Sequence, residues 1–119
     1  MKPIPWNLLR QSVTLKVPTS KDGWGTPSAY TDYSLTHVDM QQTSQTKKTV
    51  DNTLVTYNAL MFYDCARSSP AVDIISLKKS AEPYGDLLIV FGGVTYTVQA
   101  VDALRDETGD IHHYELMLL

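Results

Sequence analysis

The sequence contains a single cysteine, Cys65, among 119 residues. One thiol cannot form a disulfide within the chain, and zinc sites built on paired thiolates are excluded as well. We therefore expect a protein that works in a reducing compartment. Cys65 lies between Asp64 and Ala66 without an activating motif, and we interpret it as a small buried hydrophobic side chain.

Long apolar runs and an excess of positive charge are also missing. The strongest apolar run, residues 87–91, is far shorter than the ~20 residues that a membrane-spanning helix needs. Two prolines and Arg10 interrupt the start of the chain where a signal peptide would need a continuous apolar core. The formal net charge of -3 offers no overall attraction to a polyanion, so any DNA contact must be local. We expect a soluble, unexported protein with no membrane partner.

Glycine and proline are not enriched either, with six of each. Hydrophobic residues at 43% and charged residues at 19% are close to the globular average, which excludes a disordered or fibrous chain. The length fits one domain with its own core. We predict a single domain over residues 1–119, in which residues 1–11 form an N-terminal arm.

Apolar residues recur with period 2, which is typical of strands. Strands are predicted at 12–17, where Pro18 should end the hydrogen-bond ladder, at 29–41 and at 54–64. In the second of these the apolar face changes side near Thr36 and His37, which indicates a β-bulge.

The C-terminal third predicts a three-stranded meander. Gly92-Gly93 joins two strand-like runs within residues 86–102 as a hairpin turn, and a second turn at 106–110 leads to a last strand at 111–119. Residues 65–86 show no sustained period, although Ser69 before Pro70 could start one short helix. The fold class predicted is mostly β: a small β-barrel or sandwich-like domain.

Residues 41–53 contain one apolar residue, Val50, and cannot bury enough surface to offset the entropy of ordering. We predict a long, exposed, flexible loop or a hairpin tip. Lys47 and Lys48, flanked by Thr46 and Thr49, are its candidate functional residues. A solvated loop tip is the simpler interpretation, but in a ring of subunits these lysines would form a cationic constriction able to meet DNA phosphates.

The two adjacent histidines near the C-terminus raise the question of a metal or catalytic site. Alternation places His112 on the face of Tyr114, and His113 on the face of Glu115. The two imidazoles should therefore diverge and cannot share a metal ion. We expect His112 at a core edge, and His113 and Glu115 on a solvent or subunit face, which makes them interface candidates.

No nucleophile elbow and no phosphate-binding glycine loop is present, so we expect neither catalysis nor a cofactor. Trp24, in the polar loop "KDGWGTP", is either a lid on the domain's own core or an interface anchor. Two alternative functions remain open. One is a single-stranded nucleic-acid-binding barrel that stacks bases on Tyr30, Tyr33 and Tyr57. The other is a metal-dependent enzyme centred on the two histidines.

Three stretches together, "KDGWGTP", "YDCARSSP" and "GGVTYTVQAVDALRDETGDIHHYELMLL", resemble the small minor capsid proteins of tailed phages that infect Gram-positive bacteria. The resemblance runs from about Val13 to the C-terminus, and residues 73–84 depart from the compact form of the family.

The resemblance implies a head-tail connector protein of the head-completion or stopper type, located in the virion. Such a domain would form a homo-oligomeric ring below the portal and adaptor proteins and would join a tail or tail-terminator protein, while a single isolated chain could be monomeric. The loop at 41–53, with Lys47 and Lys48, would project into the channel and help to retain packaged double-stranded DNA.

Overall fold

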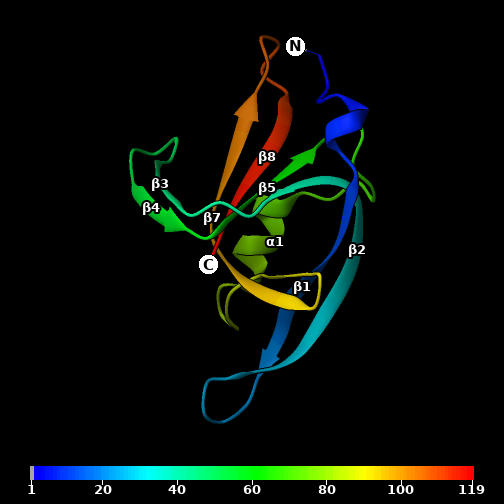
Figure 1. Cartoon of the computed structure of the whole chain (residues 1–119). Helices are drawn as coiled ribbons and strands as arrows, with labels where there is room; N and C mark the ends of the chain where they lie inside the picture. The colour runs from blue at the N-terminus through cyan, green and yellow to red at the C-terminus, as the bar shows by residue number, and fades with distance from the viewer. Residues whose placement is uncertain (1) are drawn as a thin grey trace.

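The computed structural model describes residues 2–119, and Met1 of the predicted arm lies outside them. Six strands form a closed antiparallel barrel in the order β1-β2-β5-β8-β7-β6, and two more form a separate hairpin, β3-β4 (Figure 1). The mostly β prediction is confirmed, as a barrel rather than a sandwich. The elements are η1 (Trp6–Leu8), β1 (Gln11–Lys21), β2 (Pro27–Gln41), β3 (Gln45–Lys48), β4 (Leu54–Tyr57), β5 (Ala59–Asp64), α1 (Ile74–Ala81), β6 (Leu88–Phe91), β7 (Val94–Arg105) and β8 (Ile111–Leu118).

The predicted C-terminal meander is present as β6-β7-β8. Gly92 and Gly93 join β6 to β7 with φ angles of 59° and 78°. Residues with a Cβ rarely adopt this backbone conformation. The second turn, at 106–110, joins β7 to β8. The meander supplies half of the strands of the closed barrel.

Strands β1 and β2 form the longest ladder, and its register confirms the bulge expected near His37. Gln11 pairs with Val38 and Ser12 with Thr36, so His37 is the extra residue, with φ 57°. The prediction that Pro18 ends β1 is wrong, because the strand continues to Lys21. Strand β6 pairs with β1 only over residues 14–16, so the proline lies beyond that ladder, where its missing N–H is tolerated.

The short helix α1 begins later than the sequence indicated. Asp73 caps its N-terminus by accepting hydrogen bonds from the Ser76 amide at 3.1 Å and the Ser76 hydroxyl at 2.9 Å. Ser69, predicted as the helix start, instead exchanges two backbone hydrogen bonds with Thr36 of β2. A carboxylate cap directly before the apolar Ile74 therefore outcompetes the serine four residues upstream of the cap.

Two apolar clusters lie on opposite sides of the barrel wall. The inner cluster fills the barrel with side chains from every barrel strand and from α1, including Leu15, Leu35, Met61, Ile74, Ile89, Val98, Tyr114, Leu116 and Leu118. A smaller outer cluster contains Tyr57, Leu60 and Met117, with Val55, Phe62 and Ala100 packed against it. Strand β8 contributes to both clusters, which explains why residues 114–118 are all buried.

The β3-β4 hairpin covers the outer cluster. Val55 and Tyr57 of β4 pack onto β5, β7 and β8, and Figure 1 shows the hairpin standing out to one side of the barrel. Residues 41–53 were predicted to form either a flexible loop or a hairpin tip. The structure shows a hairpin, because residues 45–48 form a regular ladder with β4. A ladder forms here because the apolar partners of the hairpin lie after residue 53, outside the window that was judged too polar to fold.

The N-terminal arm packs on the barrel rather than extending away from it. The Ile4 amide donates a hydrogen bond to the buried Asp64 carboxylate at 2.7 Å, and the Arg67 guanidinium donates to the Ile4 carbonyl at 3.0 Å. The same guanidinium lies 4.8 Å from the centre of the Trp6 ring, and Leu9 is buried. Asp64 and Arg67 therefore hold the arm against the end of β5.

Candidate functional site

The β3-β4 hairpin presents two chemically different faces. Lys47 pairs with Val55, and Lys48 with Leu54, so alternation directs successive side chains to opposite faces. Lys47 and Val55 are partly buried toward the barrel, whereas Thr46, Lys48, Leu54 and Thr56 are exposed. Of the predicted channel residues, only Thr46 and Lys48 thus lie on the open face.

Lys47 forms an ion pair with Glu115 on the outer face of β8. Glu115 is 7% exposed, and its other carboxylate oxygen accepts a hydrogen bond from His113 Nε2 at 3.0 Å. The hydrogen bond from His113 lowers the pKa of Glu115, and the Lys47 ammonium acts in the same direction against the opposing effect of burial. Glu115 and His113 were predicted to lie on a solvent or subunit face, whereas the structure shows this face covered by the hairpin of the same chain.

The prediction that the two imidazoles diverge is wrong. Their ring centroids are 5.1 Å apart, and His112 Nδ1 lies 2.8 Å from His113 Nδ1. His112 Nε2 also contacts the carbonyl oxygen of Lys2 in the arm. The register shifts here, with Leu104 paired to His113 and Arg105 to Ile111, so His112 sits in a bulge where strict alternation of the side chains fails.

Two of these contacts have acceptors that cannot donate. The Lys2 carbonyl and the Glu115 carboxylate accept hydrogen bonds, so the Nε2 atoms of His112 and His113 are the donors.

The tip of the hairpin, residues 49–53, is ordered by its own hydrogen bonds. The Thr49 amide donates to the Thr53 carbonyl at 2.8 Å, and the Asn52 amide to the Thr49 carbonyl at 2.9 Å. Thr49, 9% exposed, also donates through its hydroxyl to Asp51, which together with Thr53 lowers the pKa of Asp51. Thr49 therefore shapes the turn and is not available as a surface contact.

The aromatic predictions have mixed outcomes. Trp24 is 91% exposed at the turn between β1 and β2, which excludes the core lid and leaves the interface anchor. Tyr57 is buried in the outer cluster, Tyr33 packs on the inner cluster and Tyr30 is exposed. These three tyrosines form no common stacking platform. Cys65 is exposed and not buried as predicted, since it lies at the open end of β5 where the chain turns.

Within residues 2–119, no group of three or more His, Cys, Asp or Glu side chains could hold a metal ion. The network around Glu115 instead pairs each carboxylate oxygen with a nitrogen donor of the protein itself. In the same part of the chain, no helix has both the length and the hydropathy to cross a membrane.

Comparison with known proteins connects this geometry to a family. The family model described as minor capsid protein matches residues 5–118. The chain belongs to the minor capsid protein family. The match covers every strand of the barrel and the β3-β4 hairpin. No curated protein matches the sequence.

Membership of the minor capsid family confirms the resemblance inferred from the sequence at the level of the family, and it indicates a structural role in a phage virion. A structural role accords with a site in which charged side chains serve to fix a hairpin in place. Glu115 contacts Lys47 through one carboxylate oxygen and His113 through the other. The exposed face of the hairpin carries threonine, lysine and leucine.

Proposed function

We propose that this minor capsid protein is a head-tail connector component that forms a ring below the portal and adaptor proteins and helps to retain packaged DNA. The observation that carries the proposal is the β3-β4 hairpin, which projects from a rigid barrel and is anchored by the ion pair between Lys47 and Glu115. The ion pair holds the hairpin in one orientation, so every copy in a ring would present the same face to the channel.

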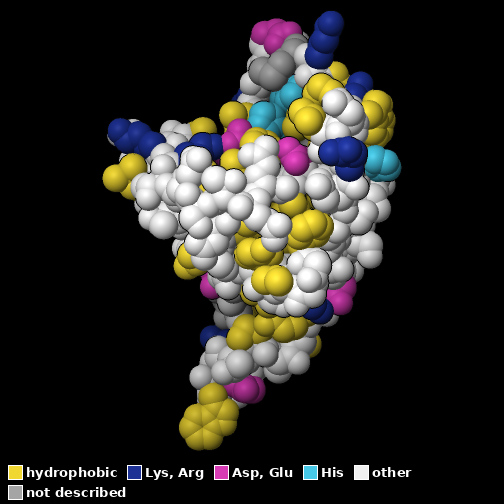
Figure 2. All heavy atoms as spheres, viewed as in Figure 1, with side chains coloured by type: hydrophobic (Ala, Val, Ile, Leu, Met, Phe, Trp, Pro, Cys, Tyr) yellow, Lys and Arg dark blue, Asp and Glu magenta, His cyan; other side chains and the backbone are white. Residues whose placement is uncertain are grey.

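In the ring, the open face of the hairpin would line the channel. Thr46 and Lys48 are exposed on this face, and repetition around an axis would gather one ammonium group from each copy into a cationic belt. Figure 2 shows basic side chains at the outer end of this projection. The contact with DNA would be through phosphates and independent of base sequence.

Lys48 is the residue whose charge tests the proposal. We expect virions with Lys48→Glu to lose genome during storage at several times the wild-type rate, since each copy would replace an attraction for phosphate with a repulsion. Lys48→Gln, which removes the charge without reversing it, should give an intermediate rate. Arg10→Glu, just before β1 and also exposed, is the matched control.

The measurement is the fraction of particles that retain DNA, together with electron microscopy of the head-tail junction. The purified variants should show unchanged thermal unfolding, because Lys48 has no ion pair within the described chain. Normal genome retention in Lys48→Glu would exclude an electrostatic role for the hairpin. Virions in which this chain is missing from the junction would refute the connector role itself.

Of the two alternative functions, the barrel that binds single-stranded nucleic acid loses its structural basis, because Tyr33 and Tyr57 are packed against the two clusters. The metal-dependent enzyme has no candidate ligand group within residues 2–119. We therefore propose no catalytic or cofactor-dependent function.

A further inference from the structure

Trp24 is an exposed aromatic side chain in the turn between β1 and β2, and we call it the knob. Its side chain is 91% exposed, and Figure 1 shows the β1-β2 hairpin extending well beyond the barrel. The Asp22 carboxylate accepts hydrogen bonds from the Trp24 amide at 2.8 Å and the Thr26 amide at 3.0 Å. A turn fixed in this way loses little conformational entropy when its tryptophan binds a partner, which is the property of an interface anchor.

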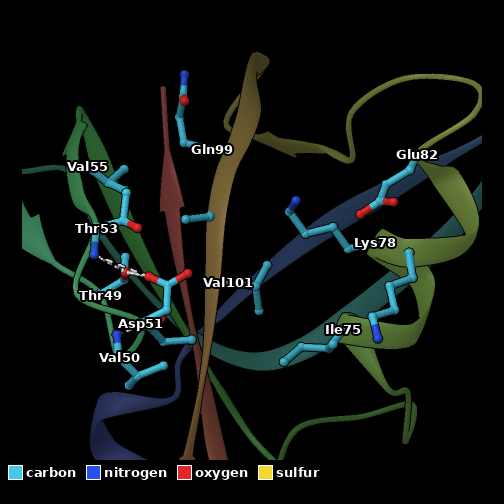
Figure 3. A pocket seen from close by; sticks show the side chains of 13 residues that line it. Thr49, Val50, Asp51, Thr53, Val55, Ile75, Lys78, Glu82, Gln99 and Val101 are labelled. Carbon is cyan, nitrogen blue, oxygen red and sulfur yellow. Dashed lines mark hydrogen bonds between the residues drawn. The ribbon is translucent and has the colours of Figure 1, made fainter.

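A groove on another face of the molecule offers a complementary surface. It has a volume of 390 Å³ and lies between the tip of the β3-β4 hairpin and α1, with β7 as its floor (Figure 3). Val55, Ile75 and Val101 line it. Val50, at its rim, is 70% exposed, so part of this apolar surface has no partner within one copy.

The polar lining of the groove suits an indole ring. Asp102, 4% exposed, accepts one long hydrogen bond in residues 2–119, from the Val50 amide at 3.4 Å, and has capacity to accept an indole N–H. Lys78 and Lys79 lie on the helical wall, and Figure 3 shows Lys78 directed into the groove. Ammonium groups are attracted to the face of a tryptophan ring.

Charge does not oppose the contact. The groove is lined by three carboxylates, those of Asp51, Glu82 and Asp102, and by two ammonium groups, which leaves one net negative charge. Lys21 and Asp22 lie together beside Trp24, so the knob carries no net charge. Lys21 is exposed and has no ion pair among the described residues, so its ammonium group is available to the carboxylates of the groove.

We propose that the groove receives Trp24 from a neighbouring copy of this chain. Because knob and groove lie on different faces of one copy, each copy would give its knob to one neighbour and accept the knob of the other. Such a head-to-tail contact closes into a ring when the rotation between copies divides a full turn. The inference rests on the proposed connector ring and names its subunit contact. A buried tryptophan would contribute about 150–250 Å² to each contact.

The test is site-directed disulfide crosslinking in intact virions. Gly23→Cys and Lys78→Cys are introduced together in a Cys65→Ser background. Gly23 has open space around an added Cβ, and Cys65 is exposed. Mild oxidation should give a ladder of multimers of this chain on a non-reducing gel. The matched control replaces Lys78→Cys with Glu107→Cys, at the β7-β8 turn, and should give no ladder.

A second variant tests the tryptophan itself. Adding Trp24→Ala to the crosslinking pair should lower the yield of multimers about tenfold or more, with unchanged circular dichroism. Val94→Ala, an exposed apolar residue on the β6-β7 hairpin, should leave the yield unchanged.

Three outcomes overturn the inference. Virions that contain the chain at the head-tail junction but give no ladder would refute this contact and leave the connector role intact. A crosslinked band with a different virion protein would assign the groove to that partner. Absence of the chain from virions would refute the contact and the connector role together.

Discussion

Glu115→Ala should destabilise the protein by about 2–3 kcal/mol, because it leaves the partly buried Lys47 ammonium and the histidine pair without their shared acceptor. The ion pair between Lys47 and Glu115 lies beneath the β3-β4 hairpin, and its side chains are 30% and 10% exposed. The hairpin should then separate from β8 and expose Met117. Urea unfolding measures the stability, and hydrogen exchange of the β3-β4 amides measures the separation.

An exposed ion pair on the same barrel supplies the control. Lys16 and Asp32 lie 3.1 Å apart with side chains 32% and 52% exposed, so Asp32→Ala should cost about 0–1 kcal/mol. Replacing both members of the pair, with Lys47→Met and Glu115→Leu, should restore the part of the loss that comes from the unpaired Lys47, since apolar side chains of similar size fit a buried position, whereas His113 still lacks its acceptor. Equal losses for Glu115→Ala and Asp32→Ala would contradict the buried role.

The effect of Glu115 should depend on pH with a defined sign. The pKa of Glu115 in the folded protein is lowered from 4.5, so the folded state favours the ionised carboxylate. Its contribution to stability is complete above that unfolded value and is lost as the pH falls through the lower folded pKa. The difference in stability between the wild type and Glu115→Gln should therefore shrink only at pH values below 4.5.

Asp64→Ala should be the most damaging single polar substitution, with a loss of about 3 kcal/mol or more. The Asp64 carboxylate is fully buried and accepts hydrogen bonds from the amides of Ile4, Ala66 and Arg67 at 2.7–3.0 Å. Alanine would leave these donors without an acceptor, and it would also release the N-terminal arm. Asp64→Asn keeps an oxygen that can accept and should lose distinctly less.

Two measurements separate the effects of Asp64→Ala. Urea unfolding reports the global loss, and limited proteolysis within residues 4–10 reports release of the arm. Asp39→Ala, on the partly exposed part of β2, is the matched control and should change neither. Protection of the arm in Asp64→Ala equal to that in the wild type would show that other contacts, such as that of Arg67 with Trp6, hold it without the carboxylate.

The barrel was predictable because its strands follow local rules. Gly92 and Gly93 define one turn, and the change of apolar parity at His37 marks the bulge, whereas the order of the strands in the closed barrel depends on contacts between segments far apart in the chain. The position of α1 was missed for a physical reason: a carboxylate and a serine can both cap a helix, and the apolar Ile74 after Asp73 decides between them.

The site was harder to predict than the fold. Nothing local distinguishes Lys47 from Lys48, although one is paired to Glu115 and the other is exposed. A signal was present in β8, whose sequence "YELML" is apolar on both faces apart from Glu115, which is typical of a strand covered on both sides. The alternation rule also failed for His112, because a bulge brings its ring back to His113.

Closure of the barrel leaves few unpaired strand edges, and in the described residues these belong mainly to the β3-β4 hairpin and the outer end of the β1-β2 hairpin. Backbone pairing between copies of the chain therefore has few places to start, which protects the folded protein from fibril-like stacking.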